Sequence, residues 1–193
     1  MFYTDVEERR HMRVIAGSAK GIRLQAVPGT TTRPISDRVK EALFSILGES
    51  IVGARFLDLF AGTGSVGIEA LSRGAAEVVF VDSEPRAVAT IRANLVHARI
   101  QQGVRVVHSD VFKYLSRPAE PFDFVYVAPP QYHGLWSRTL LAVDAAPTWL
   151  SRSAQVIVQV FPKELEPLSL SRLVLSDERQ YGSTALCFFD RVP

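Results

Sequence analysis

The chain has 193 residues, of which 47% are hydrophobic, and its 22 basic and 20 acidic side chains leave a net charge of +2. This length and apolar content suffice for one domain whose core needs neither a disulfide nor a metal. The single cysteine, Cys187, excludes an intrachain disulfide, and no stretch has the length of a membrane span or the apolar core of a signal peptide. We therefore expect a monomer of the reducing cytoplasm, with a single domain at residues 12–193 behind a charged, disordered extension at residues 1–11.

The first predicted elements lie in a basic section, residues 13–40. This section contains six Lys or Arg side chains and one acid, Asp37, so it has an excess of five positive charges. Short apolar stretches at residues 13–16 and 22–25 predict a hairpin with Lys20 at its tip. A concentrated basic surface is typical of contact with nucleic-acid phosphates, although a solvated hairpin without a partner has the same composition. The candidates for this contact are Arg13, Lys20, Arg23, Arg33 and Arg38.

A helix is predicted after this hairpin. Its apolar residues recur at helical spacing and are Val39, Leu43, Ile46 and Leu47. Ser36 stands immediately before them and is the expected N-cap, because its hydroxyl can accept from a free amide of the first turn.

The most informative stretch is a predicted strand, residues 55–60, that enters a glycine-rich turn opening a helix. Gly62 and Gly64 allow the sharp bend and a close approach of a ligand, and Gly67 lets the helix pack near the strand. The same glycine spacing occurs at dinucleotide sites, where a helix N-terminus holds a pyrophosphate. Asp58 would repel a pyrophosphate but can orient the ammonium of a methionine-like ligand, which favours S-adenosyl-L-methionine (SAM). A tight turn without any ligand remains the other alternative.

The next predicted strand, residues 77–81, ends at a carboxylate. Asp82 follows it directly, and a carboxylate there can accept hydrogen bonds from both hydroxyls of a ribose. Ser83 is expected to cap the helix that Pro85 begins.

A third predicted strand, residues 104–107, precedes a further acid, Asp110. In the SAM-dependent methyltransferases, whose first motif the glycine turn resembles, this turn lies under the adenine, so Asp110 could accept from the adenine amino group while the Val111 amide donates to a ring nitrogen. Asp110 can equally cap the following helix, and the two roles are compatible. The candidate cofactor-binding residues are Asp58, Phe60, Ala61, Gly62, Gly64, Gly67, Asp82, Ser83, Asp110 and Val111.

The fourth predicted strand, residues 122–128, runs into a double proline and an aromatic residue. This pattern resembles the (Asn/Asp/Ser)-Pro-Pro-(Tyr/Phe) motif of methyltransferases that act on exocyclic amines of nucleic-acid bases. In that motif the first side chain and a proline carbonyl accept from the amine, the prolines hold the turn and the aromatic ring stacks on the base. The candidate catalytic residues are Ala128, Pro129, Pro130, Gln131 and Tyr132.

Two departures from this motif bear on catalysis. Ala128 has no side-chain acceptor, and Tyr132 comes one residue late. A missing acceptor costs about 1–3 kcal/mol, or about one to two orders of magnitude in rate. The carbonyls of Ala128 and Pro129 remain, and Gln131 or a water molecule can supply the second acceptor. A catalytically impaired protein that binds SAM and RNA is therefore an alternative.

The remaining segments complete a doubly wound sheet. Residues 134–150 predict a helix, and residues 154–160, 172–176 and 184–189 predict three further strands. Alternating strands and helices indicate a mostly parallel sheet, while the closing pair without a helical crossover indicates an antiparallel last strand. Ligands of such sheets bind at the carboxyl ends of the strands, where the acidic and proline turns fall.

Three stretches together resemble one family: RVIAG at residues 13–17, TTRPxxDRVKEALF at residues 31–44 and LDLFAGTGSVGIEALSRGA at residues 57–75. They are similar to the bacterial RsmD-type enzymes, which methylate the 2-amino group of a guanine in 16S ribosomal RNA. The resemblance implies a Rossmann-like, seven-stranded SAM-methyltransferase fold, with residues 51–193 as the SAM-binding core and residues 12–50 as a hairpin and helix that help to hold RNA. It also implies 16S rRNA or the assembling small ribosomal subunit as the partner, with Arg33 and Arg38 near the cofactor or the RNA.

Three other functions share part of this pattern. An NAD-binding oxidoreductase would need a substrate domain for which 193 residues leave little room. A non-catalytic RNA-binding module would use the same basic section, and a methyltransferase of an adenine amine in DNA or other RNA would share the double proline. No metal is expected, because the four histidines show no metal-ligand spacing.

Overall fold

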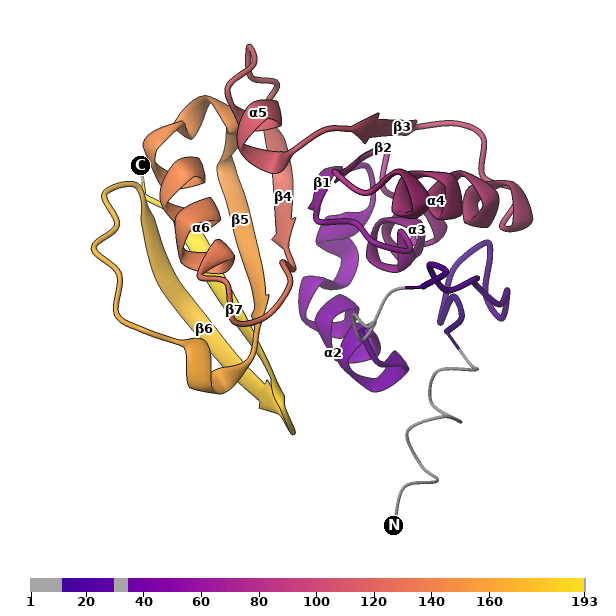
Figure 1. The fold of residues 1–193 in the computed structure, drawn as a ribbon, viewed down its shortest axis with the longest axis horizontal. Helices are drawn as coiled ribbons and strands as arrows, with labels where there is room; N and C mark the ends of the chain where they lie inside the picture. The colour runs from indigo at the N-terminus through magenta and orange to yellow at the C-terminus, as the bar shows by residue number, and fades with distance from the viewer. Residues whose placement is uncertain (1–11, 30–34, 193) are drawn as a thin grey trace.

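The computed structural model describes residues 12–29 and 35–192, which form a seven-stranded sheet of order β3-β2-β1-β4-β5-β7-β6 between layers of helices (Figure 1). The strands are β1 (Arg55–Leu59), β2 (Glu77–Asp82), β3 (Val104–His108), β4 (Phe122–Val127), β5 (Leu150–Val160), β6 (Leu173–Tyr181) and β7 (Thr184–Arg191). Neighbouring strands pair in parallel except at β7, which is antiparallel to both β5 and β6. The predicted α/β sheet with an antiparallel last strand is confirmed, and the predicted extension at residues 1–11 lies outside the described residues.

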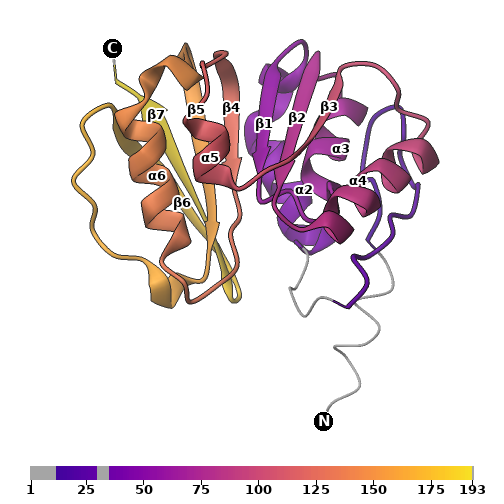
Figure 2. The ribbon, with the colours of Figure 1, turned by 45° about the horizontal axis from the view of Figure 1, so that its top comes forward.

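Helices cover both faces of the sheet. They are α2 (Asp37–Leu47), α3 (Ser65–Ser72), α4 (Pro85–His97), α5 (Val111–Leu115) and α6 (Leu135–Ala145), with short 3-10 helices at Gly48–Ile51, Pro147–Trp149 and Pro162–Glu164. Figure 2 shows α2, α3, α4 and the N-terminal segment beside the β1–β3 half, and α5 and α6 beside the β4–β7 half. Among the described residues, none of these helices combines the length and apolar character needed to cross a membrane.

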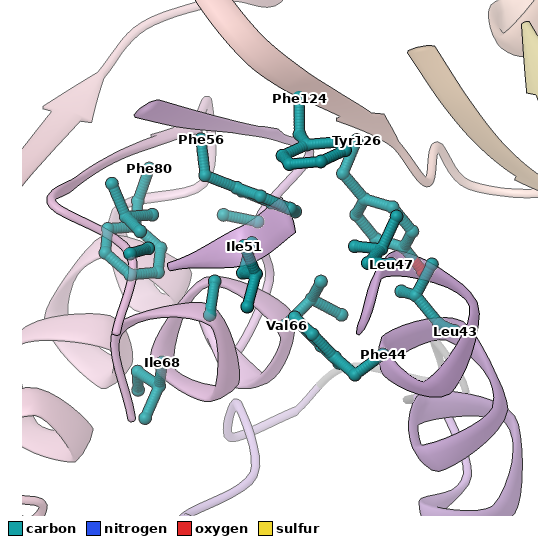
Figure 3. Packing of buried hydrophobic residues seen from close by; sticks show 14 of the residues in the cluster. Leu43, Phe44, Leu47, Ile51, Phe56, Val66, Ile68, Phe80, Phe124 and Tyr126 are labelled. Atoms are coloured by element: carbon teal, nitrogen blue, oxygen red, sulfur yellow. The ribbon is translucent and has the colours of Figure 1, made fainter. Parts of the chain in front are cut away.

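Strand periodicity divides the core between the two faces. Phe56 of β1 points to the cluster that contains α2 and α3, while Leu57 points to the cluster that contains α5 and α6. Figure 3 shows the first cluster, in which the rings of Phe56 and Tyr126 on the sheet lie near Phe44 of α2. Full burial of one such side chain stabilises the fold by about 1.5–3 kcal/mol, so these alternating residues fix which face each strand presents.

The N-terminal segment departs from the predicted regular hairpin. A single antiparallel bridge joins Arg13 to Arg23, and the intervening loop docks on the end of α3, where the Ser18 amide donates to the Ser72 carbonyl at 2.8 Å. Gly17 lies at φ +82, and a Cβ there would stand 1.8 Å from the Ser72 oxygen. The loop is therefore held by the domain surface, which is why its own strand ladder can be so short.

Local boundaries differ from prediction at two helices. Glu84, and not Ser83, caps α4, because its side chain accepts from the Arg86 amide at 3.4 Å. The helix predicted for residues 134–150 ends at Ala145, where Pro147 starts a 3-10 turn. The predicted Ser36 cap of α2 is confirmed by its hydrogen bond from the Val39 amide at 3.3 Å.

Gly67 is the point at which α3 touches β2, and it supplies a test of this packing. A Cβ there would lie 2.3 Å from Phe80 Cε1 and 2.8 Å from Val78 Cγ1. We expect Gly67→Ala to lower the free energy of unfolding by about 1–3 kcal/mol, because the core must shift to admit the methyl group. Urea denaturation measures this loss. Phe80→Leu in the Gly67→Ala protein should recover part of it, whereas simple addition of the two losses would contradict a steric clash.

Candidate active site

A cavity of about 400 Å³ opens at the carboxyl ends of β1, β2 and β4. This is the edge at which doubly wound sheets bind ligands, and the volume suits a nucleoside-sized group. Of the predicted site residues, the cavity is lined by Asp58, Phe60, Ala61, Gly62, Asp82, Ser83, Ala128 and Pro130. The predicted cofactor turn and the predicted proline turn thus meet in one cavity.

The floor of this cavity is the turn between β1 and α3. Its backbone takes positive φ values at Phe60, Gly62 and Gly64, of 61°, 55° and 75°. Two backbone hydrogen bonds hold it: the Ala61 amide donates to the Val81 carbonyl of β2 at 3.1 Å, and the Gly64 amide donates to the Ala61 carbonyl within the turn at 2.7 Å. Glycine occupies two of the three left-handed positions without steric cost, so the backbone faces the cavity without a Cβ at Gly62.

Asp58 is a buried carboxylate at the end of β1. Its side chain is 1% exposed, and its Oδ2 accepts from the Gly67 amide at 3.0 Å. Burial raises the pKa of Asp58 well above its usual range, and the neighbouring Asp82 charge adds to this, while the Gly67 hydrogen bond opposes it. A cationic group in the cavity would stabilise the ionised form.

Asp82 is held by backbone amides from both sides of the cavity. Its Oδ2 accepts from the Gly62 amide at 2.8 Å and its Oδ1 accepts from the Glu84 amide at 2.9 Å. Each carboxylate oxygen has a further lone pair, so the group can still accept from a pair of ligand hydroxyls. The two hydrogen bonds fix it in place for that task.

Several predicted cofactor residues do not line the cavity. Gly64 and Gly67 shape the turn and the α3 contact from behind it. Asp110 caps α5, accepting from the Lys113 amide at 3.0 Å, and Val111 is 3% exposed in the core. The capping role of Asp110 is therefore observed, and the adenine role of Asp110 and Val111 stays a prediction.

The proline turn after β4 lies with its first half in the cavity and its second half at the surface. Ala128 and Pro130 line the cavity, whereas Pro129, Gln131 and Tyr132 do not. Tyr132 is 68% exposed at φ 63°. Its amide donates to Glu164 Oε2 at 2.7 Å, and its ring centroid lies 5.8 Å from that of Phe161. The Tyr132 backbone is thus held by Glu164 and its ring contacts Phe161, while most of the residue stays exposed.

The predicted RNA-binding residues are exposed where the structure describes them. Arg13 pairs with Asp37, with 3.1 Å between Nε and Oδ2, and Lys20, Arg23 and Arg38 are exposed. Arg33 lies outside the described residues. These side chains keep the predicted basic character of the N-terminal loop and of α2.

Lys40, counted with that basic section, corrects the prediction. It is fully buried, and its Nζ donates to Ser65 Oγ at 2.9 Å and to the Arg13 carbonyl at 2.5 Å. Glu69 Oε2 lies 3.5 Å from the same nitrogen. Burial lowers the pKa of Lys40, and the Glu69 charge opposes this effect. Lys40 therefore joins α2 to α3 and adds nothing to a phosphate-binding surface.

Sequence reasoning missed the cavity residues that carry no motif. They are Ala26, Val27, Ile35, Thr63, Ser65, Val66, Glu84, Ala87, Tyr126 and Gln159. Thr63 lies in the glycine turn and Ser65 and Val66 lie in the first turn of α3, so these three were within reach of the motif. The others come from the N-terminal segment, α4, β4 and β5, and only the sheet order brings them together.

Comparison with known proteins identifies the fold family. A family model described as conserved hypothetical protein 95 matches residues 12–190. The protein named "Putative rRNA methyltransferase YlbH" of Bacillus subtilis is 35% identical over 184 residues, which cover 93% of this chain and 99% of that protein. Ribosomal RNA small subunit methyltransferase D of Escherichia coli is 32% identical over 181 residues, which cover 93% of this chain and 90% of that protein. The chain therefore belongs to the family that this model describes, which is conserved hypothetical protein 95.

The solved structures agree with this assignment. The structure named "Putative methyltransferase yhhF" from Escherichia coli superposes with a TM-score of 0.81 at 34% identity, covering 93% of this chain and 97% of that one. SAM-dependent methyltransferases share the fold. The chain is a methyltransferase of the SAM-dependent class, and the predicted family, fold, enzyme class and cofactor are confirmed.

Proposed function

We propose that the protein transfers the methyl group of SAM to the 2-amino group of a guanine in 16S rRNA, acting as a cytoplasmic monomer on the assembling small ribosomal subunit. One observation carries the proposal: Ala128 and Pro130 of the proline turn and Asp58 at the end of β1 line the same cavity. A methyl donor on the glycine turn would then stand beside an amine held by the proline turn. The name of the Escherichia coli relative supports ribosomal RNA of the small subunit as the substrate.

The residues at the cofactor end fit SAM. The buried Asp58 carboxylate suits the ammonium group, and Asp82, fixed by the amides of Gly62 and Glu84, suits the two ribose hydroxyls. Gly62 lets the ligand approach the backbone. SAM supplies an electrophilic methyl group on a sulfonium, and the protein's part is to bind and align it.

The residues at the substrate end hold an amine and a base. The nitrogen lone pair of an exocyclic amine is delocalised into the ring, so acceptors on its hydrogens favour the tetrahedral form that attacks a methyl group. The Ala128 and Pro129 carbonyls of the proline turn would be such acceptors. The exposed ring of Tyr132, whose backbone amide donates to Glu164, offers a surface on which an extruded base can stack.

Labelled methyl transfer tests this function. Tritiated SAM is incubated with 30S particles that lack the modification, with fully modified 30S particles and with DNA, and the labelled nucleotide is then mapped. We expect label in the unmodified particles alone, on a guanine 2-amino group. Label on an adenine amine or in DNA would replace the guanine assignment. SAM binding without transfer to any nucleic acid would overturn the catalytic proposal.

The basic N-terminal loop gives a prediction about RNA binding. Lys20→Ala with Arg23→Ala removes two exposed charges, and we expect weaker RNA binding. The slope of the logarithm of the binding constant against the logarithm of salt concentration should decrease by the amount that corresponds to about two phosphate contacts. Filter binding over a salt series measures the slope. Lys113→Ala with Arg152→Ala removes two exposed charges elsewhere and serves as the matched control. Equal slopes for the two double variants would show that the loop does not face the RNA.

A further inference from the structure

Ala128, which begins the proline turn, has no side-chain acceptor, but the adjacent strand β5 carries one, Gln159. β4 and β5 pair in parallel, with Tyr126 beside Ile157 and Val127 beside Val158. Ala128 and Gln159 each follow the last of these pairs by one residue. Tyr126, Ala128 and Gln159 all line the cavity, so the amide side chain of β5 opens into the space that a longer side chain at position 128 would face.

Gln159 is oriented by a buried phenol. The Tyr126 hydroxyl donates to Gln159 Oε1, and Tyr126 is 2% exposed. Burial raises the pKa of Tyr126 well above its usual range, and the nearby Asp58 charge adds to this, so the hydroxyl keeps its proton and acts as the donor. An amide oxygen has two lone pairs, and the hydrogen bond from Tyr126 occupies one of them. The oxygen is therefore fixed in position and can still accept.

We propose that Gln159 Oε1 accepts a hydrogen bond from the amine of the target base and thereby replaces the acceptor that Ala128 lacks. The inference rests on the proposed function, because it assigns a residue to the amine that is methylated. It makes Gln159 a catalytic residue supplied by β5 and held by Tyr126. The amine would then have a side-chain acceptor on β5 and carbonyl acceptors on the proline turn.

Gln159 fits this role better than Gln131, the acceptor that the sequence suggested. Gln131 is exposed and does not line the cavity, so ordering its side chain would cost conformational entropy. Gln159 is partly buried in a strand, and its amide is already bound to Tyr126. A preorganised acceptor is worth more in the transition state than a mobile one.

Single-turnover methyl transfer to unmodified 30S particles at saturating SAM tests the assignment. Gln159→Met keeps the length of the side chain and removes the acceptor, and we expect its rate to fall by about tenfold or more while the Kd values for SAM and RNA stay the same. Tyr126→Phe frees the amide and should lower the rate by a smaller factor. Gln155→Met is the control: this residue lies on the same strand, is bound to Asp190 and does not line the cavity, and its rate should match wild type.

Restoring the acceptor on the other strand completes the test. Ala128→Asp should raise the rate of Gln159→Met by about tenfold and should raise the wild-type rate by a clearly smaller factor, because the two side chains would serve one amine. SAM binding by each variant establishes that it is folded. A Gln159→Met rate equal to wild type, or equal effects of Ala128→Asp in both proteins, would overturn the assignment of Gln159. A wild-type protein that methylates no RNA would overturn the proposed function itself, and the assignment with it.

Discussion

Asp58→Asn is expected to weaken SAM binding by about 10- to 100-fold, because a charged hydrogen bond to the ligand ammonium contributes about 1.5–3 kcal/mol. Asparagine keeps an oxygen for the Gly67 amide, which Asp58 binds at 3.0 Å, so the β1–α3 contact survives the substitution. Alanine would remove that acceptor as well and would confuse binding with stability. Isothermal titration with SAM measures the change.

The raised pKa of Asp58 makes both the stability of the unliganded protein and its affinity for SAM depend on pH, in opposite directions. Without ligand, burial favours the protonated carboxyl, so its contribution to stability is present at low pH and is lost as the pH rises through the raised pKa. A ligand ammonium favours the ionised form, so SAM affinity of the wild type should fall as the pH drops through that pKa. Asp58→Asn should remove both dependences and leave the unliganded protein at least as stable as wild type at neutral pH.

A distant carboxylate provides the control for this pair of measurements. Asp123 at the opposite end of β4 also accepts a backbone hydrogen bond, from the Arg55 amide at 2.9 Å. Asp123→Asn should leave SAM affinity and its pH profile unchanged, because the residue does not line the cavity. An Asp58→Asn protein with wild-type affinity between about pH 5 and about pH 7.5 would remove Asp58 from the ligand site.

Glu69→Ala is expected to lower the free energy of unfolding by about 3–5 kcal/mol, the cost of breaking a buried ion pair from one side. Its carboxylate accepts from the amides of Ile15 at 2.7 Å and Ala16 at 3.0 Å, and from Arg73 Nε at 2.8 Å. The Lys40 ammonium lies 3.5 Å away. Since the side chain is fully buried, its loss would leave the Ile15 and Ala16 amides without their acceptor and the buried Lys40 ammonium without its counter-charge. Urea denaturation gives the loss, and limited proteolysis should show earlier cleavage in the N-terminal loop.

Three further variants separate this effect from a general loss of charge. Glu69→Gln keeps one acceptor oxygen and should lie between wild type and Glu69→Ala. Lys40→Met in the Glu69→Ala protein should recover part of the stability, because it removes the unpaired buried ammonium. Glu41→Ala deletes an exposed carboxylate of α2 and should change stability by less than about 0.5 kcal/mol. A loss below about 1 kcal/mol for Glu69→Ala would contradict its role as an anchor.

The sequence predicted those parts of the fold that depend on neighbouring residues. Apolar periodicity located all of the strands, and the glycine turn indicated the ligand edge. Each of these signals is carried by residues that are close together in the sequence. Lys40 was assigned to the surface because its charge is visible in the sequence, while its partner Glu69 follows only from the packing of α2 on α3. Gln159 was missed for the same reason: it lines the cavity together with Tyr126 and Ala128 because β5 pairs with β4, and no local pattern encodes this pairing.

The anchoring of the N-terminal loop limits how this protein can be dissected. Gly17 has no room for a Cβ against the Ser72 carbonyl, and the Ile15 and Ala16 amides donate to the Glu69 carboxylate. A deletion of this loop would therefore strip a face of α3 and uncover Lys40 beside the cofactor turn. Loss of methylation in such a truncated protein would report damage to the catalytic domain as much as loss of RNA contact. A loop exchanged between relatives must therefore be transferred together with the α3 residues that it contacts, Glu69 and Ser72.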